Sequence, residues 1–194
     1  MNRSSRKTKK KSRKINTLRD KPSEMLPRAY YTTNDLNQIL SQEQSNSLAL
    51  GKQLLREGVL PNSQTVEVSI LRGYPKNFIH TLYKLGVSPS QKHLTSAISH
   101  GHQDIVNYLL RVVEPTEEDL LTAIRFNYKP MIQLLLKQVQ PTDQSMYLAI
   151  YSGNKALVKQ LIKLGVKPSF SHLEVCQLFH QPEISEYLEE ILMK

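Results

Sequence analysis

Three side chains that can bind metal ions lie at four-residue intervals near the C-terminus: His172, Cys176 and His180. On an α-helix this spacing places all three on one face, and imidazole nitrogens and thiolates are ligands that zinc prefers. A structural zinc site needs a fourth ligand, and none is evident nearby. We therefore interpret these residues as structural, and we expect neither a bound metal nor another cofactor.

The sequence carries none of the common catalytic motifs. It has no Gly-Lys-Ser/Thr phosphate loop, no Gly-x-Gly-x-x-Gly, no His-Glu-x-x-His and no Gly-x-Ser-x-Gly. Cys176 is the single cysteine, which excludes an internal disulfide framework and favours a reducing compartment. We therefore expect a protein that is not an enzyme.

Positive charge is concentrated at the N-terminus of the 194-residue chain. Residues 1–28 hold eleven Lys and Arg against two acids, whereas residues 29–194 hold fifteen of each, so the net charge of +9 lies in the first segment. No apolar side chain occurs between Met1 and Ile15. Such a segment buries too little surface to offset its ordering entropy, so we predict that residues 1–31 form a basic, disordered arm.

Several functions fit this basic arm. Its densest part comprises Arg6, Lys7, Lys9, Lys10, Lys11, Arg13 and Lys14. Clustered Lys and Arg are typical of a nuclear-import signal, of an arm that binds nucleic-acid phosphates, or of an anchor to an acidic membrane surface. A mitochondrial presequence and a merely solubilising tail are further alternatives. We favour an import receptor or nucleic acid as the partner of the arm.

The remainder of the chain repeats a marker of Val, any residue, Pro, and Ser, Thr or Asn. The marker begins at Val59, Val87, Val113, Val139 and Val166, with spacings of 28, 26, 26 and 27 residues. Ten residues after each Val stands a small residue, and fourteen after it stands Gly, Asn or His. A period of this length indicates an array of stacked repeats.

The pattern of each repeat predicts two short helices. The Ser, Thr or Asn after Pro suits the N-cap of the first helix, and the Gly or Asn suits a left-handed position at its end. Paired apolar residues such as Ile105-Val106 and Leu109-Leu110 then form one face of a second helix. We predict N-terminal capping helices in residues 32–58, followed by five helix pairs in residues 59–194.

The stretch from Ile98 to Leu110, with Gly101-His102, Ile105-Val106 and Leu109-Leu110, resembles the ankyrin repeat. Residues 149–165 resemble it again and close on Gly165. The units of 26–28 residues are shorter than the family's ~33, and the shortfall falls where the family carries its β-hairpin loop. The resemblance implies an all-α, ankyrin-like solenoid of helical hairpins, in which a tight turn replaces the hairpin.

Ankyrin-like proteins are binding scaffolds, and the resemblance implies that the first helices line the binding face. Positions 8, 9, 12 and 13 after each marker Val are expected to be exposed there. In the two central units these positions hold Leu121, Thr122, Arg125, Phe126, Tyr147, Leu148, Tyr151 and Ser152. Tyr128 lies in the following loop and is also expected to be exposed. Because aromatic residues and Arg are favoured binding hot spots, we predict partner contact at Leu121, Arg125, Phe126, Tyr128, Tyr147, Leu148 and Tyr151, although burial between units is an equal alternative.

Four lysines, Lys155, Lys159, Lys163 and Lys167, step by four residues through a predicted second helix and into the following marker. They could form a second basic stripe for phosphates, but a solvated outer helix face explains them better.

These observations predict a non-catalytic protein-interaction scaffold whose helical face binds a protein. The alternatives are a structural component of a ribonucleoprotein or other nucleic-acid assembly, and a secreted bacterial effector that acts in a host cell. No apolar run approaches the ~18 residues that a membrane span needs, so we expect no membrane span. We expect an intracellular protein of the nucleus or cytoplasm, in a host cell if it is an effector.

Overall fold

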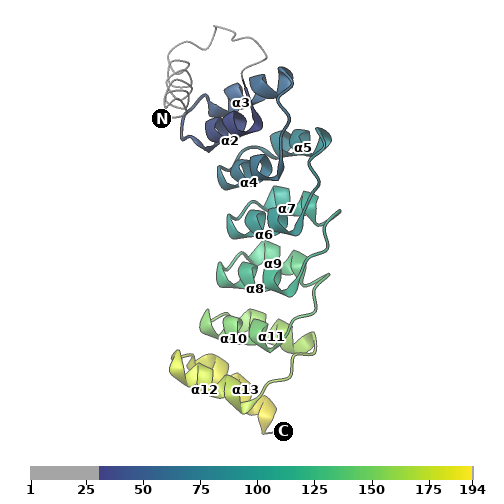
Figure 1. Ribbon diagram of the computed structural model, residues 1–194. Coiled ribbons are helices and arrows are strands. Elements are labelled where there is room, and N and C mark those ends of the chain that lie inside the picture. The colour runs from purple at the N-terminus through teal and green to yellow at the C-terminus, as the bar shows by residue number, and fades with distance from the viewer. Residues whose placement is uncertain (1–30, 194) are drawn as a thin grey trace, which may run out of the picture.

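The computed structural model describes residues 31–193, in which it contains twelve helices and no strand. Consecutive helices form antiparallel pairs, and the pairs stack in series from the N-terminal to the C-terminal end of this region (Figure 1). The pairs are α2 (Thr33–Ser41) with α3 (Ser47–Arg56), α4 (Ser63–Leu71) with α5 (Lys76–Lys84), α6 (Gln91–Ser99) with α7 (Gln103–Leu109), α8 (Glu117–Arg125) with α9 (Lys129–Leu135), α10 (Asp143–Tyr151) with α11 (Lys155–Lys163), and α12 (Phe170–Leu178) with α13 (Pro182–Leu192). The predicted all-α class is confirmed for these residues, and the predicted arm lies outside them except for Tyr31.

The first helix of each of the five pairs from α4 to α13 begins where the marker predicts. The residue after the marker proline is the N-cap of α4, α6, α8, α10 and α12, namely Asn62, Ser90, Thr116, Thr142 and Ser169. Asn62, Ser90 and Thr142 each accept a hydrogen bond from a backbone N–H of the first turn. The marker therefore works as a helix start signal, with the proline one residue outside the helix.

The first helices from α4 to α12 each end in a left-handed residue. Gly73, Gly101, Asn127, Gly153 and His180 all have positive φ angles, as the repeat pattern predicts. The next N–H donates to the carbonyl of the small residue five positions earlier, for example Gln181 to Cys176 at 2.8 Å. This hydrogen bond is that of a Schellman motif, which reverses the chain tightly into the second helix.

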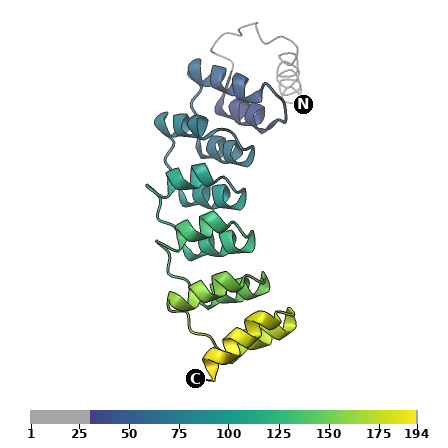
Figure 2. The ribbon, with the colours of Figure 1, turned by 180° about the vertical axis from the view of Figure 1, so that it is seen from behind.

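The second helices end in two ways, depending on the residue before the marker Val. Where it is Gly58, Gly86 or Gly165, it adopts a positive φ, and the Val N–H bonds the carbonyl five residues back. Where it is Val112 or Gln138, the Val N–H instead bonds the carbonyl four residues back, and α7 and α9 have only seven residues. The missing glycine thus accounts for the two shortest second helices. The links from each pair to the next run along one edge of the stack (Figure 2).

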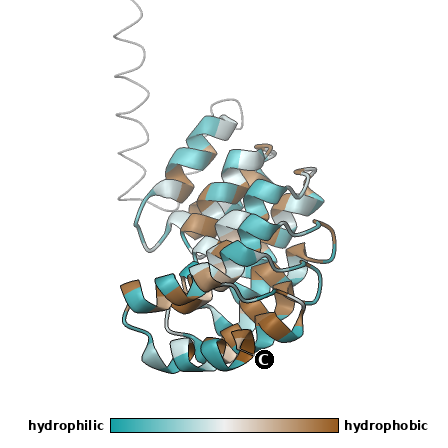
Figure 3. Ribbon diagram, turned by 90° about the horizontal axis from the view of Figure 1, so that it is seen from below, coloured by the Kyte–Doolittle hydropathy of each residue, from teal (hydrophilic) through white to brown (hydrophobic). Residues whose placement is uncertain are grey.

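The core is a continuous column of apolar side chains inside the stack. The small residues Ser69, Ala97, Ala123, Ala149 and Cys176 are at most 1% exposed, because neighbouring first helices pack against them. Individual helices are coloured both brown and teal in Figure 3, as expected for amphipathic helices that bury one face. Helices of seven to eleven residues are not stable alone, so this stacking holds them together.

A line of buried polar residues crosses the stack near the starts of the first helices. The sixth residue after each marker Val is polar and fully buried: Thr65, His93, Asp119, Ser145 and His172. Several of them bond the preceding helix pair, as in the contacts of Thr65 with Asn37 at 2.5 Å and of His93 with Ser63 at 2.9 Å. These bonds tie adjacent pairs together and fix their register. This buried polar position is not among the predicted features of the repeat.

Candidate interaction surface

The structure separates the predicted partner-binding residues by exposure. Arg125, Phe126 and Tyr151 are exposed, with Phe126 at 50% and Tyr151 at 59%. The prediction that Leu121 and Thr122 are exposed is wrong, because each is only 5% exposed. Helix α8 packs against three helices, α6, α9 and α10, and these neighbours together cover Leu121 as well as the predicted core face of α8. Leu121 is therefore a core residue and not part of a surface.

Exposed apolar side chains gather at the ends of three adjacent first helices. We define the aromatic strip as Phe126, Tyr151, Leu178 and Phe179, which occupy positions 12 and 13 after their marker Val. Leu178 is 70% exposed and Phe179 is 39% exposed. Because α8, α10 and α12 pack in succession, these side chains lie on neighbouring elements along one edge of the stack.

Leu178 and Phe179 are not among the predicted contact residues, although the sequence carries a signal for them. The prediction of exposed side chains at positions 12 and 13 covers the two central units. The same rule applied to the unit that begins at Val166 gives these two residues directly.

Each aromatic ring of the strip contacts another ring, either within the strip or beside it. Tyr151 and Phe179 meet edge to face with ring centroids 4.7 Å apart, and Phe126 stacks on Tyr128 at 5.7 Å. Edge-to-face and offset stacked arrangements are the favoured ones for aromatic pairs. The rings are thus held in place before any partner arrives, which lowers the entropy that binding would cost.

Tyr128 is only half-buried, and it anchors the strip to the preceding unit. Its ring lies against the turn at Gly101, where an added Cβ would come within 3.2 Å of it. Its hydroxyl points to the Ser99 carbonyl at 3.5 Å. Tyr128 therefore contacts both Phe126 and the Gly101 turn, and it is less exposed than its loop position predicts.

Tyr147 and Leu148 are half-buried between units. The Tyr147 ring packs against the buried His172 with centroids 4.5 Å apart. These two residues therefore contribute more to the contact between α10 and α12 than to an open surface.

The three potential metal ligands do not converge. His172 is buried near the start of α12, where its Nδ1 accepts a hydrogen bond from the Ser169 N–H at 3.0 Å. Cys176 is buried in the core, and its burial raises the pKa of its thiol, which disfavours a reactive thiolate. His180 is exposed beyond the end of α12 with a φ of 52°. Within residues 31–193, no group of three or more His, Cys, Asp or Glu side chains is placed to hold a metal ion.

Two of the four stepped lysines contact the C-terminal helix α13. The Nζ of Lys155 lies 3.7 Å from a carboxylate oxygen of Glu183, and that of Lys159 lies 4.9 Å from the centre of the Tyr187 ring. Lys163 and Lys167 are exposed. Half of this row therefore makes surface contacts between α11 and α13.

No known protein family model matches the chain, and no curated protein matches it. Among residues 31–193, no helix has the length and apolar character needed to cross a membrane.

Proposed function

We propose that this protein is a non-catalytic interaction scaffold that binds a partner protein through the aromatic strip. The observation that carries the proposal is the exposure of Phe126, Tyr151 and Leu178 at equivalent ends of three adjacent helices. Large apolar side chains gathered on one surface mark interaction sites, whereas single exposed ones are ordinary. Arg125 is exposed beside Phe126 and adds a polar anchor of the kind enriched at hot spots.

The serial stack of helix pairs supports this reading. It is compatible with an ankyrin-like solenoid whose β-hairpins are replaced by short turns. Such an array presents an extended, rigid face, and its binding residues can vary without disturbing the core. In this proposal the chain works inside a cell, in the nucleus or cytoplasm.

The basic arm supplies attachment in this proposal. The eleven Lys and Arg of residues 1–28 attract an import receptor or nucleic-acid phosphates. The same charge is the observation that favours the second candidate function, a component of a nucleic-acid assembly. Binding through phosphates falls steeply with salt, whereas binding through an apolar strip does not.

The test compares proteins captured by the tagged full-length chain with those captured by a strip variant. The strip variant carries Phe126→Ala, Tyr151→Ala and Leu178→Ala. A matched control variant carries Leu60→Ala, Val112→Ala and Phe170→Ala, three apolar residues that are 68%, 61% and 71% exposed away from the strip. Each capture is quantified by mass spectrometry with and without nuclease.

We expect one partner to survive nuclease and to fall by more than about tenfold with the strip variant but not with the control variant. Equal capture by the wild-type chain and the strip variant would overturn the scaffold proposal. Loss of the whole captured set on nuclease treatment would favour the nucleic-acid assembly. Circular dichroism confirms that each variant is folded.

A further inference from the structure

Neighbouring second helices meet through one position of the repeat. This position lies three residues after the first buried residue of each second helix. From α5 to α13 it holds Thr81, Tyr108, Leu134, Gln160 and Tyr187.

Long side chains at this position bridge to the preceding second helix. Tyr108 stacks on Tyr83 with ring centroids 5.8 Å apart, and the amides of Gln160 and Gln133 exchange two hydrogen bonds of 2.8 and 2.9 Å. The Nζ of Lys159 lies over the Tyr187 ring, 4.9 Å from its centre. Each of these side chains therefore crosses the space between two adjacent helices.

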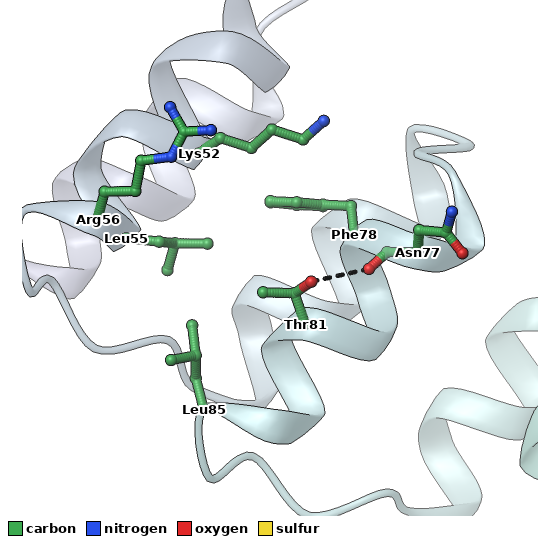
Figure 4. A pocket seen from close by; sticks show the side chains of 7 residues that line it. All are labelled: Lys52, Leu55, Arg56, Asn77, Phe78, Thr81 and Leu85. Carbon is green, nitrogen blue, oxygen red and sulfur yellow. Dashed lines mark hydrogen bonds between the residues drawn. The ribbon is translucent and has the colours of Figure 1, made fainter.

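Thr81 fills no such space at the first junction, between α3 and α5. Its hydroxyl donates a 2.9 Å hydrogen bond to the Asn77 carbonyl of its own helix. A groove of about 500 Å³ remains between the two helices. Figure 4 shows Phe78 reaching into the opening, with Leu55 and Leu85 along one side of it.

The rim of this groove is cationic. Lys52 and Arg56 project from α3 at its edge, both are exposed, and no carboxylate lines it (Figure 4). Among residues 31–193 neither side chain has an ion-pair partner. An apolar floor beneath two cations favours a partner that offers an apolar group flanked by carboxylates.

The last junction of the same molecule provides the precedent. Lys52 and Arg56 stand seven and three residues before Val59, and Lys159 and Lys163 stand seven and three residues before Val166. At that last junction the acidic helix α13 supplies Tyr187 to Lys159 and Glu183 to Lys155. The first junction thus presents cations equivalent to Lys159 and Lys163, with Thr81 in place of the Tyr187 ring, whereas the equivalent of Lys155 is Leu48.

We propose that the groove between α3 and α5 binds an acidic peptide segment of a partner protein. An aromatic side chain of that segment enters beside Phe78, Thr81 and Leu85, and its flanking carboxylates pair with Lys52 and Arg56. Residues 1–28 of this chain do not suit the site, because their eleven basic residues outnumber two acids. The site is separate from the aromatic strip, which belongs to α8, α10 and α12.

The test measures binding of a fluorescein-labelled Glu-Glu-Tyr-Leu-Glu-Glu peptide to the full-length chain by fluorescence anisotropy. Thr81→Tyr places in the groove the side chain that fills the last junction. The double substitution Lys52→Glu and Arg56→Glu reverses the charge of the rim. Both residues are exposed, so this double substitution leaves the core intact. The matched control, Lys129→Glu with Lys137→Glu, makes the same charge change at exposed residues elsewhere. A second peptide with Ala in place of Tyr tests the aromatic contact.

We expect Thr81→Tyr and the reversed rim each to weaken binding by about tenfold, and the control pair to leave it within about twofold. The Ala peptide is expected to bind as weakly to the wild-type chain as the Tyr peptide binds to Thr81→Tyr. Unchanged affinity in Thr81→Tyr would overturn the proposal, as would an equal loss in the control pair, which would indicate general charge attraction. A wild-type dimer in sedimentation velocity that Thr81→Tyr converts to monomer would also overturn it, because a second copy would then be the occupant.

Discussion

The buried carboxylate of Asp119 accepts a 2.8 Å hydrogen bond from the hydroxyl of Thr95, which belongs to the preceding helix pair. The same carboxylate accepts from the Thr116 N–H at 2.8 Å and so caps its own helix. One side chain therefore starts α8 and links it to α6. This double role explains why a fully buried position in a repeat of apolar helices is polar.

Replacing this carboxylate is expected to destabilise the stack. Asp119→Ala removes the cap and the hydrogen bonds that Thr95 and Thr116 donate to the buried carboxylate, which together cost about 2–4 kcal/mol. Urea unfolding followed by circular dichroism measures the change. Glu118→Ala is the matched control, because the exposed Glu118 makes only a 4.0 Å ion pair with the exposed Arg125. Equal effects of the two substitutions would contradict the role assigned to Asp119.

Acidification is expected to destabilise the fold through two buried histidines. Burial lowers the pKa of His93 and of His172 below the usual 6.5, against smaller raising effects of Ser63 and Asp143. The unfolded chain therefore binds more protons than the folded chain in this range, so stability falls as the pH drops below about 6.5. In His172 a proton on Nδ1 would also displace the hydrogen bond from Ser169.

Urea midpoints at pH 7.5 and pH 5 measure this dependence. The double variant His93→Gln and His172→Gln is expected to show a smaller fall in stability between the two pH values than the wild-type chain shows. His100→Gln, at an exposed position, serves as the control and should keep the full fall. An undiminished fall in the double variant would assign the pH dependence to other groups.

A glycine at the end of α12 is expected to stabilise the last pair. His180 holds a φ of 52°, which costs a residue with a side chain about 1 kcal/mol relative to Gly. His180→Gly should therefore raise the unfolding free energy by roughly that amount. The reverse substitution, Gly153→Ala, should lower it by at least about 1 kcal/mol, because the φ is 65° and the new Cβ would meet Gln181 at 3.0 Å. If His180→Gly instead lowers the unfolding free energy, the His180 side chain contributes more stability through its contacts than its backbone strain costs.

The sequence predicted the starts and ends of the first helices because single residues determine them. An N-cap such as Thr142 and a left-handed position such as Gly153 act within one turn of the chain, so the repeat spacing locates them. The exposure of Leu121 was predicted wrongly because it depends on three neighbouring helices, which no local pattern records.

The groove could not be predicted for a similar reason. Thr81 is unremarkable along its own helix, and its small size matters only opposite Leu55 and Lys52 of another pair. The same applies to the aromatic strip, which needs α8, α10 and α12 to lie side by side. Local signals thus predict the elements, whereas the surfaces follow from how successive pairs are packed.

The contact between Lys159 and Tyr187 offers a final prediction, since it closes the junction that Thr81 leaves open at the other end. Tyr187→Thr removes a half-buried ring from the interface of α11 and α13, and with it the cation–π contact. We expect a loss of about 1–2 kcal/mol in unfolding free energy. A double-mutant cycle with Lys159→Ala separates the pair from the packing, and a coupling of about 0.5–1 kcal/mol is expected. If the two substitutions are additive, Lys159 does not hold Tyr187, and the ring contributes through its packing alone.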